Sequence, residues 1–268
     1  MLRNNQPPEK VRILSRLTGT FFLFFLLCLP AVLSAKPAGE EDRAREILEF
    51  VDDLWRSGSS HGIIEMRVQT RNYSRILEME SWSKGREKSL VRILNPLKER
   101  GTVSLKSDNN LYTYLPKTDR TIRLTSSMML GSWMGSHFTN DDLVKESRLA
   151  EDYDARLAFE GERDGIPLIE LELIPRPDAP VVWGKIVITV QAEHYLPIQS
   201  WYYDEEMRLA RTLTFSEITE MGGRKLPKVL RMVPADKPDE FTGIVYKEIR
   251  FEVDLADDFF SLGQLRRR

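Results

Sequence analysis

Cysteine is almost absent from this chain. Cys28 is the only one among 268 residues, and it lies in an apolar run near the N-terminus. If that run is removed on export, the mature chain contains no cysteine, which excludes disulfides, cysteine metal sites and thiol catalysis. A mature chain without a thiol also suits an oxidising compartment, where a stray thiol is a liability.

Catalytic motifs are lacking as well. The sequence contains no H-E-x-x-H, C-x-x-C, G-x-S-x-G or P-loop motif. Its three histidines, His61, His137 and His194, are far apart, and none has a partner at metal-ligand spacing. We therefore predict no catalytic residue, no metal site and no cofactor, and a protein that is not an enzyme. His137, beside Phe138, is the histidine that we single out for inspection.

Paired acids give little support for acid–base chemistry. Adjacent residues point in different directions on a strand or a helix, so neighbouring carboxylates do not form a catalytic pair by themselves. A glycosidase with carboxylates on separate strands remains the enzyme alternative. The adjacent acid pairs are Asp52-Asp53, Asp141-Asp142, Glu205-Glu206 and Asp257-Asp258.

An excess of positive charge is also missing. The chain has 39 basic and 41 acidic residues, and four of the basic ones fall within residues 1–35. The rest is therefore mildly acidic, and phosphate attraction needs a basic face, so we expect no nucleic-acid binding. We interpret the terminal Arg266-Arg267-Arg268 as a solvated tail.

Only one long apolar run occurs. Residues 21–29 are nine apolar residues in succession, preceded by Arg12 and Arg16 and followed by small residues at 31–35. This is the order of a secretory signal peptide. The run is short for a bilayer, which needs about 20 apolar residues. We predict a signal peptide at residues 1–35 and a periplasmic location, with an uncleaved inner-membrane anchor as the alternative.

The mature part, residues 36–268, is predicted to be one domain. Residues 39–56 have the three- and four-residue apolar spacing of a helix that ends at Gly58. The apolar residues of this stripe are Ala44, Ile47, Leu48, Val51, Leu54 and Trp55.

Alternating polar and apolar residues predict antiparallel strands after this helix. Hairpin turns are expected at Asp164-Gly165 and Gly222-Gly223. The first expected series lies at about 63–71, 76–83, 87–94, 100–106 and 110–115. The second lies at about 154–163, 165–174, 181–193, 196–204, 208–219, 224–233 and 240–254. We therefore predict a mainly β (α+β) domain of about 11–12 strands.

A different segment separates the two series. Residues 125–150 contain three of the nine methionines close together, and methionine tolerates variable packing partners. Thr139 with Asp142 predicts the start of a short helix. The segment is either a loop tucked into the core or a lid over an apolar cavity. A sheet of this size must curl, and curled sheets with helices at the mouth enclose cavities.

Several blocks of residues, in this order, resemble the outer-membrane lipoprotein-sorting (LolA-like) family of periplasmic lipoprotein carriers. His137 stands where that family usually has Asp. The blocks are residues 111–116 followed by Arg120 and Arg123, residues 134–143, residues 195–197 with Tyr203-Asp204, and Asp258-Phe259-Phe260.

The resemblance implies an unclosed antiparallel β-barrel or half-barrel with helices over its hollow face. It also implies an apolar cavity for lipid or lipoprotein acyl chains. The partners would be an inner-membrane transporter of the ABC or RND type and an outer-membrane acceptor. Lipoprotein, phospholipid, sterol-like lipid and glycolipid cargoes all stay open.

Our first hypothesis is that the protein is a periplasmic carrier. The second is that it is a lipid-sensing regulatory module of the same fold, which binds a membrane signalling protein. The third is that it is an enzyme on a curled sheet. For the first, the expected lipid-contacting residues fall into two groups. Those on strands are Met66, Val68, Met79, Val91, Ile93, Tyr112 and Tyr114. Those on the cover are Met128, Met129, Trp133, Met134 and Phe138.

Overall fold

The computed structural model describes residues 38–145 and 148–266. The predicted signal peptide lies outside these residues. Within them, no helix is both long and apolar enough to cross a membrane. The described residues all belong to one compact unit, Lys36–Arg268.

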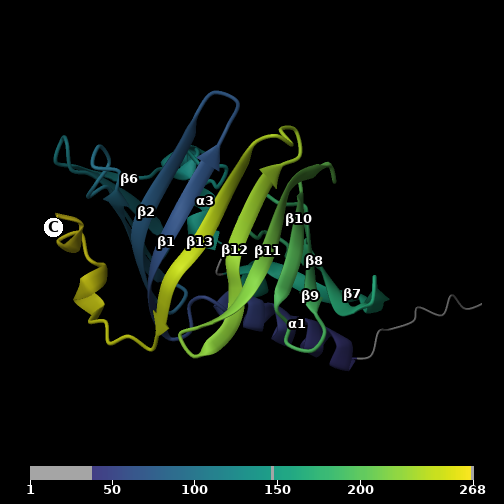
Figure 1. Cartoon of the computed structure of the whole chain (residues 1–268). Helices are drawn as coiled ribbons and strands as arrows, with labels where there is room; N and C mark the ends of the chain where they lie inside the picture. Colours follow the sequence, from purple (N-terminus) through teal and green to yellow (C-terminus); the bar gives the residue numbers. More distant parts are fainter. Residues whose placement is uncertain (1–37, 146–147, 267–268) are drawn as a thin grey trace, which may run out of the picture. The chain divides into compact units, whose positions relative to one another are not determined.

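One antiparallel, unclosed sheet of 13 strands dominates the fold (Figure 1). Its strand order is β6-β5-β4-β3-β2-β1-β13-β12-β11-β10-β9-β8-β7. The strands before the central segment are β1 Ser59–Gln69, β2 Ser74–Lys84, β3 Lys88–Asn95, β4 Val103–Ser107, β5 Asn110–Leu115 and β6 Arg120–Arg123. Those after it are β7 Tyr153–Arg163, β8 Ile166–Pro175, β9 Lys185–Gln191, β10 Pro197–Tyr203, β11 Leu209–Met221, β12 Arg224–Pro234 and β13 Phe241–Phe251.

Each series of strands is a meander, and the two series join at one seam. There β1 pairs with β13, so the first and last strands of the chain lie side by side at the middle of the sheet (Figure 1). The predicted hairpin turns are confirmed: Asp164 and Gly165, and Gly222 and Gly223, all have positive φ, as a two-residue type I′ turn requires. The sequence did not predict β6, a four-residue strand at one edge.

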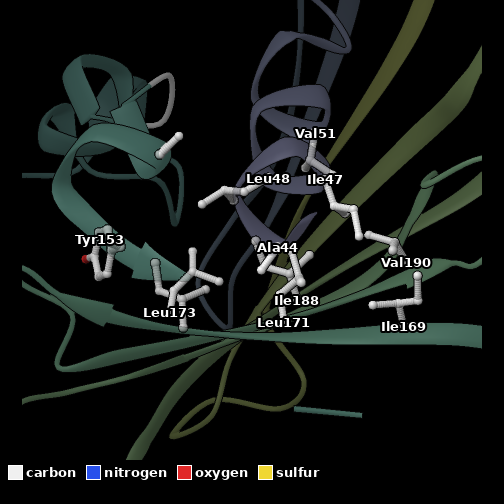
Figure 2. Packing of buried hydrophobic residues seen from close by; sticks show 12 residues of the cluster. Ala44, Ile47, Leu48, Val51, Tyr153, Ile169, Leu171, Leu173, Ile188 and Val190 are labelled. Carbon is white, nitrogen blue, oxygen red and sulfur yellow. The ribbon is translucent and has the colours of Figure 1, made fainter. Parts of the chain in front are cut away.

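The register places alternate residues of every strand on one face, which we call the inner face. Ile64 pairs with Met79 and Tyr246, and Leu213 pairs with Met232, so these apolar residues share that face. Helix α1 (Ala38–Asp53) covers one half of it, over β7, β8 and β9. Figure 2 shows the buried side chains of this contact, which are contributed by Ala44, Ile47, Leu48 and Val51 on α1.

The predicted helix at 39–56 is therefore confirmed, with an earlier end. Helix α1 stops at Asp53, and the reversal of the chain falls at Ser57, whose φ is 54°, before Gly58. Of the predicted apolar stripe, Ala44, Ile47, Leu48 and Val51 lie on the helix and are buried, whereas Leu54 and Trp55 follow its end.

The segment between the two meanders covers the other half of the inner face. We call residues 125–145 and 148–152 the cover segment; it contains α2 Ser126–Met129, η1 Trp133–Gly135, α3 Asn140–Lys145 and α4 Leu149–Asp152. The capping interaction predicted at Thr139 is confirmed. The Thr139 backbone N–H donates to Asp142 Oδ2 at 2.8 Å, and the Asp142 N–H donates to Thr139 Oγ1 at 3.1 Å.

The C-terminal residues pack on the opposite, outer face of the sheet. There η3 (Asp257–Phe260) and η4 (Gln264–Arg266) lie over β3 and β4. Phe260 and Leu265 are buried against Leu90, Val103 and Leu105. Both faces of this half of the sheet are thus covered, one by the cover segment and the other by the C-terminus.

Candidate functional site

A cavity of about 190 Å³ lies between the inner face and its covers. It sits at the seam of the two meanders, since Ile64 of β1 and Tyr246 of β13 both line it. Trp55, just after α1, forms part of the wall and stacks between Phe215 and Tyr246 at centroid distances of 5.7 and 6.1 Å. The cover segment contributes Trp133 to the same cavity.

The size of this cavity limits what it can hold. An apolar cavity of about 150 Å³ in a protein binds a molecule as large as benzene. Pockets for drug-sized ligands are larger, at about 300–1,000 Å³. The cavity therefore accommodates a short hydrocarbon segment as it stands, and a complete acyl chain needs the cover segment or the sheet to move.

One end of the cavity is polar. Ser60, Ser83 and Ser89 stand in register on β1, β2 and β3, and Ser81 is the next inner-face residue of β2. All four serines line the cavity, and the Oγ atoms of Ser60 and Ser83 are 2.7 Å apart. Small hydroxyl side chains leave space where larger apolar ones would fill it. The cavity is therefore amphipathic, with hydroxyls at one end.

Asp52, near the end of α1, also lines this cavity. Burial raises the pKa of its carboxyl to about 7. The backbone N–H of Ala150 donates to Asp52 Oδ2 at 3.1 Å, and the charges of Arg86 and Arg56 oppose the effect of burial without cancelling it. This contact links α1 to the cover segment.

A buried ion pair joins the cover segment to the sheet. Arg211 of β11 donates from Nη1 and Nη2 to the two carboxylate oxygens of Asp142 on α3, at 2.7 and 2.6 Å. The guanidinium also lies over the rings of Trp183 and Tyr202, at 4.3 and 4.4 Å from their centroids. Burial would raise the pKa of Asp142, but the Arg211 charge and hydrogen bonds, with those of Thr139, hold it below its ordinary value.

His137 makes a second polar link between the cover segment and the sheet. Its Nδ1 lies 2.9 Å from Thr242 Oγ1, and its Nε2 lies 3.1 Å from Glu240 Oε2. The His137 backbone N–H donates to the same Thr242 oxygen at 2.9 Å. Thr242 is fully buried. The one histidine that the sequence singled out is thus part of an anchor. Among the described residues, no group of three or more His, Cys, Asp or Glu could hold a metal ion.

Most of the residues expected to contact lipid come together in one cluster on the inner face. Of these, Val91, Trp133 and Phe138 line the central cavity. The cluster contains the predicted residues Met66, Val68, Met79, Val91, Ile93, Trp133, Met134 and Phe138. Met66, Val68 and Met79 are fully buried and are not among the residues that line the cavity.

Four predicted residues lie elsewhere. Tyr112 and Tyr114 pair with Leu105 and Val103 and pack on the outer face, so they do not point inward as expected. The physical reason is the alternation of side chains along β5. The residues next to Tyr112 and Tyr114 in the sequence face inward, so the two tyrosines face outward. Met128 and Met129 belong to α2, and Met128 is 43% exposed. Neither methionine lines the central cavity.

The sequence analysis missed the polar residues of the site. Arg211 lies two residues before Leu213 and four before Phe215, which are both on the inner face of β11. The two-residue periodicity of a strand could therefore have placed Arg211 on that face as well. The three serines in register could not have been found in this way, because their alignment depends on pairing across three strands.

Three solved structures have similar folds. A DUF1329 family protein from Desulfovibrio piger is 23% identical, with a TM-score of 0.75, over 85% of this chain and 99% of that one. A domain named for outer membrane lipoprotein sorting, from Vibrio parahaemolyticus, is 23% identical, with a TM-score of 0.72, over 85% and 100%. A LolA superfamily protein from Nitrosomonas europaea is 24% identical, with a TM-score of 0.70, over 82% and 98%.

No curated protein matches the sequence. A family model described as "Uncharacterized protein" matches residues 85–267, which is more than half of the chain. The chain therefore belongs to that family, and its fold is similar to that of the LolA superfamily and of outer-membrane lipoprotein-sorting domains.

Proposed function

We propose that this protein is a periplasmic carrier that holds a lipid or lipoprotein acyl chain in its central cavity and moves it towards the outer membrane without altering it chemically. The observation that carries the proposal is the amphipathic cavity between the inner face and the cover segment. The similarity of fold to lipoprotein-sorting domains supports it. Export would follow from the predicted signal peptide at residues 1–35.

The physical need for such a carrier is large. Two acyl chains contain roughly 30 methylenes, and each gains about 0.8 kcal/mol on leaving water. A free lipid therefore crosses an aqueous compartment too slowly to be useful. A carrier replaces the lost membrane contacts with an apolar lining, and hydroxyls such as those of Ser60 and Ser83 can bind the polar group where the chain begins.

Release requires that the carrier open. The polar anchors of the cover segment described above are the Arg211–Asp142 ion pair and the His137 contacts. In our proposal, an inner-membrane transporter of the ABC or RND type loads the cavity and an outer-membrane acceptor empties it. Each partner would act by displacing the cover segment from the sheet.

The first experiment asks whether lipid is bound in the central cavity. Native mass spectrometry of protein purified from the periplasm should detect co-purifying lipid. Ser81→Leu fills the polar end of the cavity and should remove most of that lipid while circular dichroism stays unchanged. The matched control is Ile76→Leu, because Ile76 is on the same strand but 47% exposed on the outer face. Equal lipid content in all three proteins would contradict the proposal.

A second experiment separates carriage from mere binding. A carrier transfers a labelled lipid from donor to acceptor vesicles at a rate that rises with protein concentration. A lipid-sensing module would bind the lipid and retain it. Transfer by the parent protein and its loss in Ser81→Leu are the results that we expect.

A further inference from the structure

A second, larger pocket lies beside the central cavity. Its volume is about 550 Å³, which is within the range of small-molecule sites. The inner faces of β3 to β6 form one wall, through residues such as Ile93 and Ile122, and the cover segment forms the other, through Met128 and Met134. We call it the side pocket.

Trp133 separates the side pocket from the central cavity. Its side chain lines both, and it is 6% exposed. The indole Nε1–H donates to Ser104 Oγ on β4 at 3.1 Å, which fixes the orientation of the ring. The two compartments therefore share one apolar partition and can be tested separately.

The charge of the side pocket is its distinguishing feature. Three cations line it, Arg75, Lys98 and Lys117, against a single carboxylate, Glu99. Arg75 Nη2 donates to Glu99 Oε2 at 2.5 Å, so these two charges offset each other. Neither Lys98 nor Lys117 has an ion-pair partner among the residues that the structure describes, and both are exposed. The pocket thus keeps two uncompensated positive charges.

The two lysines belong to neighbouring turns. Lys98 lies in the turn between β3 and β4, and Lys117 lies in the turn between β5 and β6. These turns approach each other closely, because a Cβ added at Gly101 would stand 3.6 Å from Pro116 Cγ. Thr102 and Thr118 line the same pocket. Ammonium groups and hydroxyls together bind phosphate or carboxylate oxygens.

We propose that the side pocket is a second ligand site, which binds the phosphate or carboxylate of an anionic amphiphile between Lys98 and Lys117 and its hydrocarbon chain against Trp133. This inference goes beyond the proposed function, because the central cavity offers hydroxyls and no comparable excess of cations. The side pocket selects its ligand by charge, and the central cavity selects by apolar burial.

The test compares two probes with the same acyl chain, lysophosphatidic acid and monoacylglycerol, by isothermal titration calorimetry. Lys98→Gln with Lys117→Gln should weaken lysophosphatidic acid binding about tenfold, because hydrogen bonds to charged groups are the strong ones. Monoacylglycerol binding should not change. The control is Lys225→Gln with Lys228→Gln on β12, which removes the same charge from residues outside the pocket.

Two further measurements locate the ligand and identify its source. Ile122→Trp fills the side pocket, so it should abolish binding of lysophosphatidic acid and leave binding of monoacylglycerol unchanged. Inorganic phosphate should bind far more weakly than lysophosphatidic acid, since it lacks the chain; equal binding would make this a free-phosphate site and overturn the proposal. Unchanged lysophosphatidic acid binding in the lysine variant would also overturn it. Failure of monoacylglycerol binding alone would count against the central cavity instead.

Discussion

The side chain of Asp142 has two roles, one of them through its ion pair with Arg211. Asp142 caps α3, as the sequence predicted from its spacing to Thr139, and it also accepts hydrogen bonds from Nη1 and Nη2 of Arg211 on β11. The second role was not predicted, because sequence spacing says nothing about a partner 69 residues away. Local chemistry was readable here, and the long-range contact was not.

The ion pair leads to a prediction about stability. Asp142→Asn should lower the free energy of unfolding by about 3–5 kcal/mol, because it removes the negative charge that Asp142 holds against the buried Arg211 guanidinium. Urea denaturation measures this directly. Adding Arg211→Met removes the other half of the ion pair, so the double variant should lose less stability than the losses of the two single variants added together. Strict additivity would contradict the coupling.

Asp52 leads to a prediction about pH. Its native pKa is raised to about 7, so the native state holds a proton that the unfolded state loses near 3.8. The stabilising effect of that proton is complete below about pH 4 and is lost as the pH rises through 7. Asp52→Asn still accepts the Ala150 hydrogen bond and does not ionise. Its stability relative to the parent should therefore increase between pH 4 and pH 8.

Chemical denaturation at three pH values tests this sign. The exposed turn variant Asp164→Asn serves as the control, because it removes an equal charge without changing a buried group. A difference between Asp52→Asn and the parent that is the same at pH 4 and pH 8 would show that the Asp52 carboxyl is not perturbed in the native state.

At the scale of elements, the regular ones were predictable and the irregular ones were not. Helix α1 and twelve strands follow from apolar periodicity, which depends on neighbours in sequence. The edge strand β6 was missed because it is only four residues long and largely exposed. Tyr112 and Tyr114 were assigned to the wrong face, because both faces of β5 are covered and the alternation of its residues is weak there.

The C-terminal segment was also missed, and it yields a prediction of its own. Phe260 is 4% exposed and packs against Leu90 and Leu105 on the outer face. Phe260→Ala should cost about 3–5 kcal/mol of folding stability, as expected for a large buried aromatic. Leu262→Ala, in the same segment but 51% exposed, should cost less than about 0.5 kcal/mol. Thermal unfolding distinguishes the two, and similar losses would mean that the segment does not stabilise the sheet.

At the scale of the described unit, chain order explains where the cavity lies. The first and last strands pair at the seam, so residues from both meanders, such as Ile64 and Leu230, face the same space. The cover segment connects the two meanders and lies over their inner face. A curled sheet with a cavity could be predicted from strand number and the central segment. Its volume could not, because that depends on which side chains fill it.

The central claim is that the central cavity holds hydrocarbon. A crystal structure of the protein with a monoacylglycerol brominated near the end of its chain tests it most directly, because bromine is located by its anomalous scattering. We expect a bromine peak in the central cavity, bounded by Trp133, Leu230 and Tyr246. Bromine found only on the outer face, with the cavity closed by the protein's own side chains, would contradict the account.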